Sequence, residues 1–119
     1  MESKAITKYV RISPFKARLV ADLVRGKQVE DAYTILQYTR KKATVPIMKT
    51  IKSAVSNAIS QKGTFEVKPE DMYVAEIRVD EGPMMKRFRP MAMGRAGMIR
   101  RRSSHISVIV KTKSEVFKE

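Results

Sequence analysis

The stretch from Met84 to Arg102 most limits what this chain can fold into, because it holds seven Lys or Arg residues and no acidic residue. Each unpaired cation that is taken out of water costs several kcal/mol. A folded core therefore excludes this stretch, which must lie in solvent or against an anionic partner. The same stretch holds five of the eight Met residues, together with Pro90, Gly94 and Gly97, and this mixture favours a shaped tip over a plain solvated loop.

Short β-branched segments flank this stretch and indicate two paired strands. YVAEIRV (residues 73–79) precedes it and HISVIV (residues 105–110) follows it, and such segments favour β-structure. We interpret residues 80–104 as an extended basic β-hairpin arm, whose two limbs of about twelve residues reach on the order of 40 Å at the rise of a strand. Since a two-stranded ribbon is marginal alone in water, we expect a partner to order it.

Alternating apolar residues predict three strands, at residues 5–12, 72–79 and 105–112. In each strand, one face is expected to contact the core. The residues on these faces are Ile6, Val10 and Ile12 in the first strand, Tyr73, Ala75, Ile77 and Val79 in the second, and Ile106, Val108 and Val110 in the third.

The first of three predicted helices follows Ser13 and Pro14, which favour a helix start because Ser caps free amides and Pro loses no hydrogen bond there. Gly26 favours its end. The apolar residues at helical spacing predict its buried stripe. They are Phe15, Leu19, Val20, Leu23 and Val24.

Two further helices are expected before residue 63. One runs from about Glu30 to Tyr38, with Ala32, Ile35 and Leu36 buried. The third is the longest and has two possible starts: Thr44 caps it with Pro46 in the first turn, which we favour, or it begins near Lys41 and kinks. Its expected core positions are Ile47, Met48, Ile51, Ala54, Val55, Ala58 and Ile59.

These elements predict an α+β fold, in which three helices pack on a small three-stranded antiparallel sheet with a long protruding β-hairpin. A chain of 119 residues is expected to form a single globular domain. The residues 64–71 have the composition of a turn, and the tail 113–119 is polar.

The charge balance indicates a polyanionic partner. The formal net charge is +13, and the 100 residues outside the stretch 84–102 still hold 18 Lys or Arg against 12 Asp or Glu. Such a surface attracts nucleic acid first and an acidic membrane second. The chain has no Cys and no apolar run of about 20 residues, and its start, MESKAITKYV, lacks the pattern of a signal or transit peptide. We therefore expect a soluble cytoplasmic protein.

Enzymatic chemistry is not expected. His105 is the single histidine, and it has no neighbouring nucleophile or carboxylate in a recognisable motif. The paired acids at residues 30–31, 70–71 and 80–81 sit where helix starts and turns explain them. GRAG (residues 94–97) is too short for a phosphate-binding loop. We predict no catalytic residue, no cofactor and no metal.

Basic residues in the arm and around the first helix are the candidate RNA contacts. Arg binds phosphate in a bidentate manner and stacks on bases, while Met and Phe lie on apolar base faces, a combination that suits folded RNA. The candidates are Arg11, Lys16, Arg18, Arg25, Lys27, Lys86, Arg87, Arg89, Arg95, Arg100, Arg101, Arg102 and His105, and Lys41, Lys42, Lys49 and Lys52 are a possible extension.

The chain resembles the bacterial large-subunit ribosomal protein twenty-two family. The similarity runs from about Ala5 to Val110 and is carried by SPFKARLVADLVRGKQVEDA, AVSNAIS and VDEGPMMKRFRPMAMGRAGMIRRRSSHISVIV. The resemblance implies a protein that binds large-subunit ribosomal RNA early in assembly, contacts neighbouring ribosomal proteins and forms no homo-oligomer.

By the same resemblance, the hairpin runs inward and its tip lines the nascent-peptide exit tunnel. Met85, Lys86 and Arg87 fall in the region associated with macrolide sensitivity. The tip residues nearest the nascent polypeptide are Phe88, Arg89, Pro90, Met91, Ala92, Met93, Gly94 and Arg95. Family members often carry basic residues where this chain has Met91 and Met93, so its tip differs in charge.

Two other function classes fit the sequence less well. An architectural DNA-binding protein can use a basic β-arm with a proline wedge in the minor groove, but such proteins are usually dimers and this chain shows no spare apolar face. A membrane-surface protein needs an amphipathic helix in the arm, which Pro90, Gly94 and Gly97 disfavour.

Overall fold

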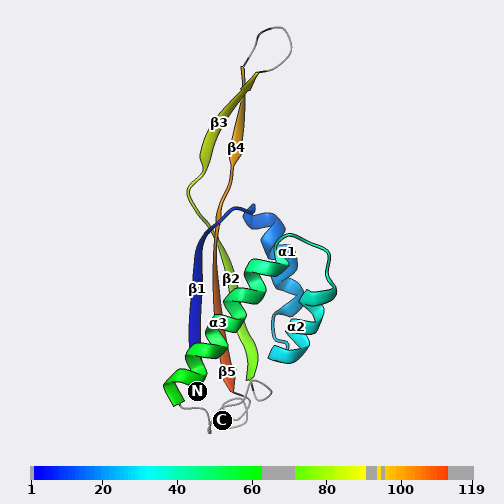
Figure 1. Ribbon diagram of the computed structural model, residues 1–119, viewed down its shortest axis with the longest axis vertical. Coiled ribbons are helices and arrows are strands. Elements are labelled where there is room, and N and C mark those ends of the chain that lie inside the picture. The colour runs from blue at the N-terminus through cyan, green and yellow to red at the C-terminus, as the bar shows by residue number, and fades with distance from the viewer. Residues whose placement is uncertain (1, 63–71, 91–93, 95, 113–119) are drawn as a thin grey trace.

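The computed structural model describes residues 2–62, 72–90, 94 and 96–112 (Figure 1). The expected turn 64–71, the tip residues 91–93 and 95, and the tail 113–119 lie outside this description. The described residues form three helices and five strands. Their order is β1 (Glu2–Val10), α1 (Pro14–Val24), α2 (Val29–Tyr38), α3 (Thr44–Lys62), β2 (Met72–Glu81), β3 (Met85–Pro90), β4 (Ala96–Arg101) and β5 (Ser104–Thr112).

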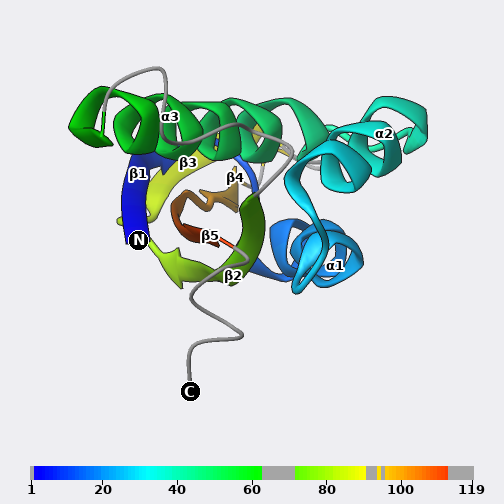
Figure 2. The ribbon, with the colours of Figure 1, turned by 90° about the horizontal axis from the view of Figure 1, so that it is seen from below.

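An antiparallel sheet of order β1-β5-β2 forms the centre of the body. Viewed along the strands, α3 lies across one face of the sheet and α1 lies beside β2 (Figure 2). The expected α+β fold is therefore confirmed. β3 pairs with β4 in a second sheet that extends beyond the body. The molecule measures 65 × 25 × 25 Å and has a radius of gyration of 17.6 Å, against about 13.5 Å for a compact domain of this length.

The core lies between the sheet and the helices, and α3 supplies much of it. Ile47, Ile51 and Ala54 are fully buried at the predicted helical spacing. The helix begins at Thr44 with Pro46 in its first turn, which confirms the position of the favoured start, but Thr44 is the first helical residue and not the cap. The Thr44 hydroxyl donates to the Lys41 carbonyl at 2.8 Å. The central strand β5 buries Ile106, Val108 and Val110 as predicted.

The buried face of α1 differs from the prediction. Phe15, Leu19 and Leu23 were expected in the core, but they are 70%, 54% and 45% exposed. Val20 and Val24 of the predicted stripe are buried as expected, and the small residues Ala17 and Ala21 complete the buried face. Small residues let α1 approach α2 and β2 closely, so the large apolar side chains are turned outward.

Irregular pairing in the two outer strands changes which residues face the core. In β2, Val74 pairs with Val110 and Glu76 pairs with Ile109, so Ala75 is an extra residue in a β-bulge. The buried residues therefore change from Met72 and Val74 before the bulge to Ile77 and Val79 after it. The predicted core positions of Tyr73 and Ala75 are wrong, because one inserted residue reverses the alternation.

A similar irregularity lies in β1 between Thr7 and Val10, where Tyr9 has a φ of 59°. Ala5 is buried and Ile6 is 47% exposed, so the prediction that Ile6 faces the core is wrong. Beyond the irregularity, Val10 and Ile12 pack against the core as expected. A positive φ is uncommon for Tyr, and for this reason the sequence carries no clear signal for the irregularity.

The free edge of β2 is closed by α1 and the connection that follows it. Arg18 donates from Nε and Nη2 to the Val79 carbonyl at 3.2 and 2.9 Å, and Arg25 Nη2 donates to the Ile77 carbonyl at 2.9 Å. Further along, the Val74 N–H donates to the Lys27 carbonyl at 2.8 Å. An open strand edge is a site of unwanted pairing, and these contacts occupy it.

We expect Arg18→Met to lower the free energy of unfolding by about 1.5–3 kcal/mol, the usual contribution of hydrogen bonds to a charged group. Urea denaturation followed by circular dichroism measures this change. Lys16→Met is the matched control, because Lys16 is exposed on the same helix and surface substitutions stay within about 0.5 kcal/mol. Equal midpoints for the two variants would show that the Arg18 contacts add nothing.

Candidate nucleic-acid interface

Six basic side chains line an open groove beside the base of the hairpin arm. The groove has a volume of about 1040 Å³ and lies between the first half of α1, the connection from α2 to α3 and the junction of β4 with β5. Its basic residues are Arg11, Lys16, Arg40, Lys41, Lys42 and Arg102, and its apolar residues are Ile12, Phe15, Leu19, Val20 and Ala43. None of the lining residues that the structure describes is acidic. We call this surface the basic groove.

Local hydrogen bonds hold the two walls of the basic groove. In one wall, the Lys41 carbonyl accepts from the Thr44 N–H at 3.2 Å and from the Thr44 hydroxyl at 2.8 Å. In the other, the Ser13 hydroxyl oxygen accepts from the Lys16 N–H at 3.4 Å and so caps α1, as predicted. The sequence around Ser13 and around Thr44 thus positions the neighbouring cations.

No acid in the described part of the chain neutralises the charges of the basic groove. Among the described residues, no salt bridge involves Arg11, Lys16 or any other cation of the groove. Clustered like charges in a concave surface focus the field and raise the local concentration of anions. The groove is therefore suited to a polyanion, which would relieve the repulsion between its cations.

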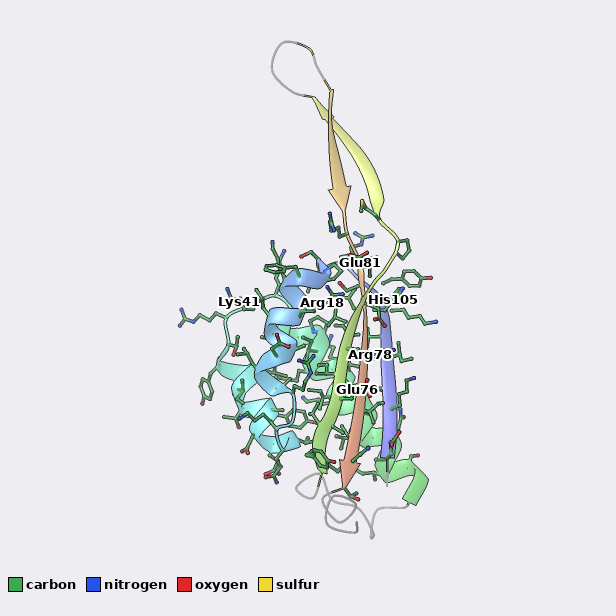
Figure 3. The ribbon with its side chains drawn as sticks, turned by 180° about the vertical axis from the view of Figure 1, so that it is seen from behind. Arg18, Lys41, Glu76, Arg78, Glu81 and His105 are labelled. Atoms are coloured by element: carbon green, nitrogen blue, oxygen red, sulfur yellow. The ribbon has the colours of Figure 1, made fainter. Side chains whose placement is uncertain are left out.

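The open face of the sheet has a different electrostatic character. Arg78 forms two ion pairs, from Nε to Glu76 Oε1 at 3.9 Å and from Nη2 to Asp80 Oδ2 at 3.7 Å. Lys111 Nζ lies 3.7 Å from Glu2 Oε2. Glu76 and Arg78 lie on the sheet, whereas Lys41 lies on the helical side (Figure 3). Exposed ion pairs such as these contribute little to stability, but they cancel charge. Part of the positive charge on this face is thus paired with acids, whereas no described acid pairs with the cations of the basic groove.

The arm joins the body at a narrow neck. The Gly82 N–H donates to the Ser103 carbonyl at 3.0 Å, and the Ser103 hydroxyl donates to the Pro83 carbonyl at 2.7 Å. A Cβ at position 82 would collide with the Ser103 hydroxyl and lie 3.2 Å from His105 Cε1. Glycine at this position allows the two limbs to approach closely.

His105 supports this neck. Its Nδ1 accepts from the Tyr9 N–H at 3.1 Å, and its ring meets the Tyr9 ring edge to face, with centroids 5.0 Å apart. These contacts hold Tyr9 in its left-handed conformation beside the arm. The structure gives His105 a role in the neck, and its proposed contact with phosphate stays a prediction.

The backbone register of the arm is set by the antiparallel pairing of β3 with β4. Lys86 is the partner of Arg100 in the antiparallel ladder of β3 and β4, and Met85 is the partner of Arg101. The expectation that a partner orders the arm stays a prediction. Arg95 lies outside the described residues.

The predicted basic set of the body divides into two groups. Arg11 and Lys16 line the basic groove, whereas Arg18 and Arg25 bind carbonyls of β2. Lys27 is exposed in the connection between α1 and α2. RNA contacts of Arg18 and Arg25 stay a prediction. Some of the N–H groups of these two guanidinium groups already donate to carbonyls of β2.

Sequence reasoning missed Arg40 as a site residue and treated Lys41 and Lys42 only as an extension. The signal was present, since three consecutive cations precede the start of α3. Lys52, also part of that extension, lies 5.7 Å from the centre of the Tyr33 ring. Burial raises the pKa of Tyr33 above its usual value.

Within the described ranges, no group of three or more His, Asp or Glu residues is arranged to hold a metal ion. No helix in this part of the chain is long and apolar enough to cross a membrane. A basic hairpin on an α+β body, next to an acid-free groove, defines a protein that binds a folded polyanion, above all RNA.

The comparisons with known proteins make this class specific. A family model described as Ribosomal protein L22p/L17e matches residues 5–111. The Large ribosomal subunit protein uL22 of Halothermothrix orenii is 50% identical over 115 residues, which is 97% of this chain and 99% of the relative. The proteins of the same name from Desulfitobacterium hafniense and Clostridium acetobutylicum are each 54% identical, over 96% and 93% of this chain and 97% of each relative.

The chain therefore belongs to the ribosomal protein L22p/L17e family, in its bacterial form. This result confirms the family that the hairpin and helix motifs resemble. It also confirms that the protein is structural and not an enzyme, and the DNA-binding alternative is not favoured.

We expect the triple substitution R40Q/K41Q/K42Q to reduce the salt dependence of binding to a fragment of large-subunit ribosomal RNA. Each lost phosphate contact lowers the slope of log K against log salt by about 0.7–0.9, so the slope should fall by roughly 2 to 3. Fluorescence anisotropy in a salt series measures it.

The control is K4Q/K8Q/K111Q, which removes the same charge from the exposed side of β1 and β5. It should change the slope by less than about one contact. If the two triple variants behave alike, general net charge and not the basic groove determines binding.

Proposed function

We propose that this protein is a structural constituent of the large subunit of the cytoplasmic ribosome, which binds ribosomal RNA through the basic groove and the hairpin arm and thereby aids assembly. The observation that carries the proposal is the acid-free groove beside the base of the arm, in a chain that belongs to the L22p/L17e family. The named relatives are large ribosomal subunit proteins.

The mechanism is charge neutralisation between RNA segments that would otherwise repel each other. Lys and Arg replace condensed counterions on the phosphates, and the released counterions supply much of the binding free energy. With its longest dimension of 65 Å, the molecule can contact segments that are far apart in the RNA. The arm gains its contacts as the RNA folds around it.

The position of the arm in the ribosome is part of this function. Residues 1–119 act as one monomeric domain, with residues 80–104 as the arm, and the body contacts neighbouring ribosomal proteins. The arm points inward, so that residues 88–95 line the wall of the exit tunnel and meet the nascent polypeptide. Gly94 has a φ of +73°, which suits a tight turn at such a tip. Residues 85–87 lie in the region associated with macrolide sensitivity.

Substitution of Arg100, Arg101 and Arg102 by Ala should weaken the association with large-subunit RNA and impair subunit assembly. Loss of three phosphate contacts costs roughly tenfold or more in affinity at moderate salt. Co-sedimentation with large subunits during a salt wash measures the loss, which should occur at lower salt than for the unsubstituted protein. Retention through the same salt steps would contradict the proposed role of this segment.

The same protein should prefer large-subunit RNA fragments over duplex DNA of equal length at matched salt. A preference for the DNA duplex would instead support an architectural DNA-binding protein and would overturn the proposed function.

A further inference from the structure

Among the residues that the structure describes, Phe15 makes no contact with another aromatic ring. It is 70% exposed, and together with Ile12, Leu19 and Ala43 it gives the basic groove an apolar portion. Ser13 and Pro14 fix the start of α1 and so place Phe15 in the first turn, on the wall of the groove. Exposure alone is common for large apolar residues in this chain, but Phe15 is the aromatic residue among the described lining of a groove rich in cations, and this combination points to a contact with a ligand.

The chemistry around Phe15 limits what that ligand is. Six cations with no acid in the lining select an anionic ligand. Binding of phosphate alone does not explain why an aromatic ring and aliphatic side chains line the groove. A nucleotide combines both requirements, because it has a flat apolar base and a charged phosphate on either side.

The base must also be accessible. In a double helix, the faces of the bases are stacked on each other, and only an unpaired nucleotide in a loop, a bulge or an end offers a free face. Aromatic side chains beside a positively charged groove are the usual platform for such bases. The groove volume of about 1040 Å³ is at the upper end of the ~300–1000 Å³ found for small-molecule sites, so it has room for a base with its flanking phosphates.

We infer that the basic groove is a binding site for an unpaired nucleotide of RNA, whose base stacks on Phe15 while its flanking phosphates contact the cations of residues 40–42 and Arg102. This inference rests on the proposed function and adds the kind of RNA element that the body recognises. The N-cap and first turn of α1 line the same groove, and the helix dipole adds positive potential near that end. In this arrangement the arm contacts phosphates along the RNA, whereas the groove binds an unpaired base close to the segment that the arm contacts.

A tryptophan introduced in place of Phe15 reports stacking directly, because the chain has no Trp of its own. In Phe15→Trp, we expect a short single-stranded oligoadenylate to quench the tryptophan fluorescence, and the duplex of the same oligomer with oligouridylate to leave it nearly unchanged. The matched control is Leu23→Trp, which lies two turns further along the same helix, is 45% exposed in the native chain and does not line the groove. Its fluorescence should respond to neither RNA.

Affinity measurements separate stacking from general apolar contact. Phe15→Leu keeps an apolar side chain and should lower the affinity for the single strand by about tenfold, the usual effect of losing one base-aromatic stack. Phe15→Tyr should retain it. Because the side chain is exposed, circular dichroism should show the same fold for both variants.

The outcomes distinguish the two levels of the proposal. If the RNA binds in a salt-dependent manner but the fluorescence of the Phe15→Trp variant is not quenched, or if Phe15→Leu binds as tightly as the native chain, the stacking site is refuted and the ribosomal function stands. If polyglutamate quenches the Phe15→Trp variant as strongly as the single strand does, the groove is a site for an acidic polypeptide and the inference is overturned. If the native chain binds neither RNA, the proposed function itself fails.

Discussion

Positive charge that no acid neutralises is the constraint on which this structure depends. The chain carries 25 Lys or Arg against 12 Asp or Glu, and burial of an unpaired cation is too costly for any core. The fold places its cations in three settings. Some pair with acids on the open face of the sheet, as Arg78 does. Two, Arg18 and Arg25, bind carbonyls of β2. Others line the basic groove, where no described acid pairs with them. The unpaired group needs a polyanion, and this need connects the structure to RNA.

The body supports the arm, and the unusual backbone of Tyr9 and the close approach at Gly82 both lie where the arm joins the body. β5 is the central strand, and together with β2 it leads into the two limbs of the hairpin. Gly82, Ser103 and His105 bring the limbs together at the neck, and Tyr9 braces His105 from β1. Because α1 covers the other edge of the sheet through Arg18 and Arg25, the sheet is held on both sides of the point where the arm leaves.

Most of the fold could be predicted from local patterns. The start of α1 after Ser13, the start of α3 at Thr44 and the core face of β5 were all predictable, because each depends on residues that are adjacent in the sequence. The errors share a physical cause. A single bulge at Ala75 reverses the alternation of a strand, and close packing through Ala17 rotates α1 so that larger apolar residues face outward. Both depend on contacts between distant segments, which periodicity does not record.

The sequence by itself determined the α+β class, the basic hairpin and the membership of the L22p/L17e family. Composition, the periods of strands and helices, and the hairpin motifs depend on residues that lie close together in the sequence. Only the tertiary structure decided which cations are available to a ligand. It brought Arg11, residues 40–42 and Arg102 to one groove and assigned Arg18 and Arg25 to the edge of the sheet. It also placed Phe15 among those cations. A charge is free or occupied according to which backbone and side-chain groups lie beside it, and that depends on how distant segments pack.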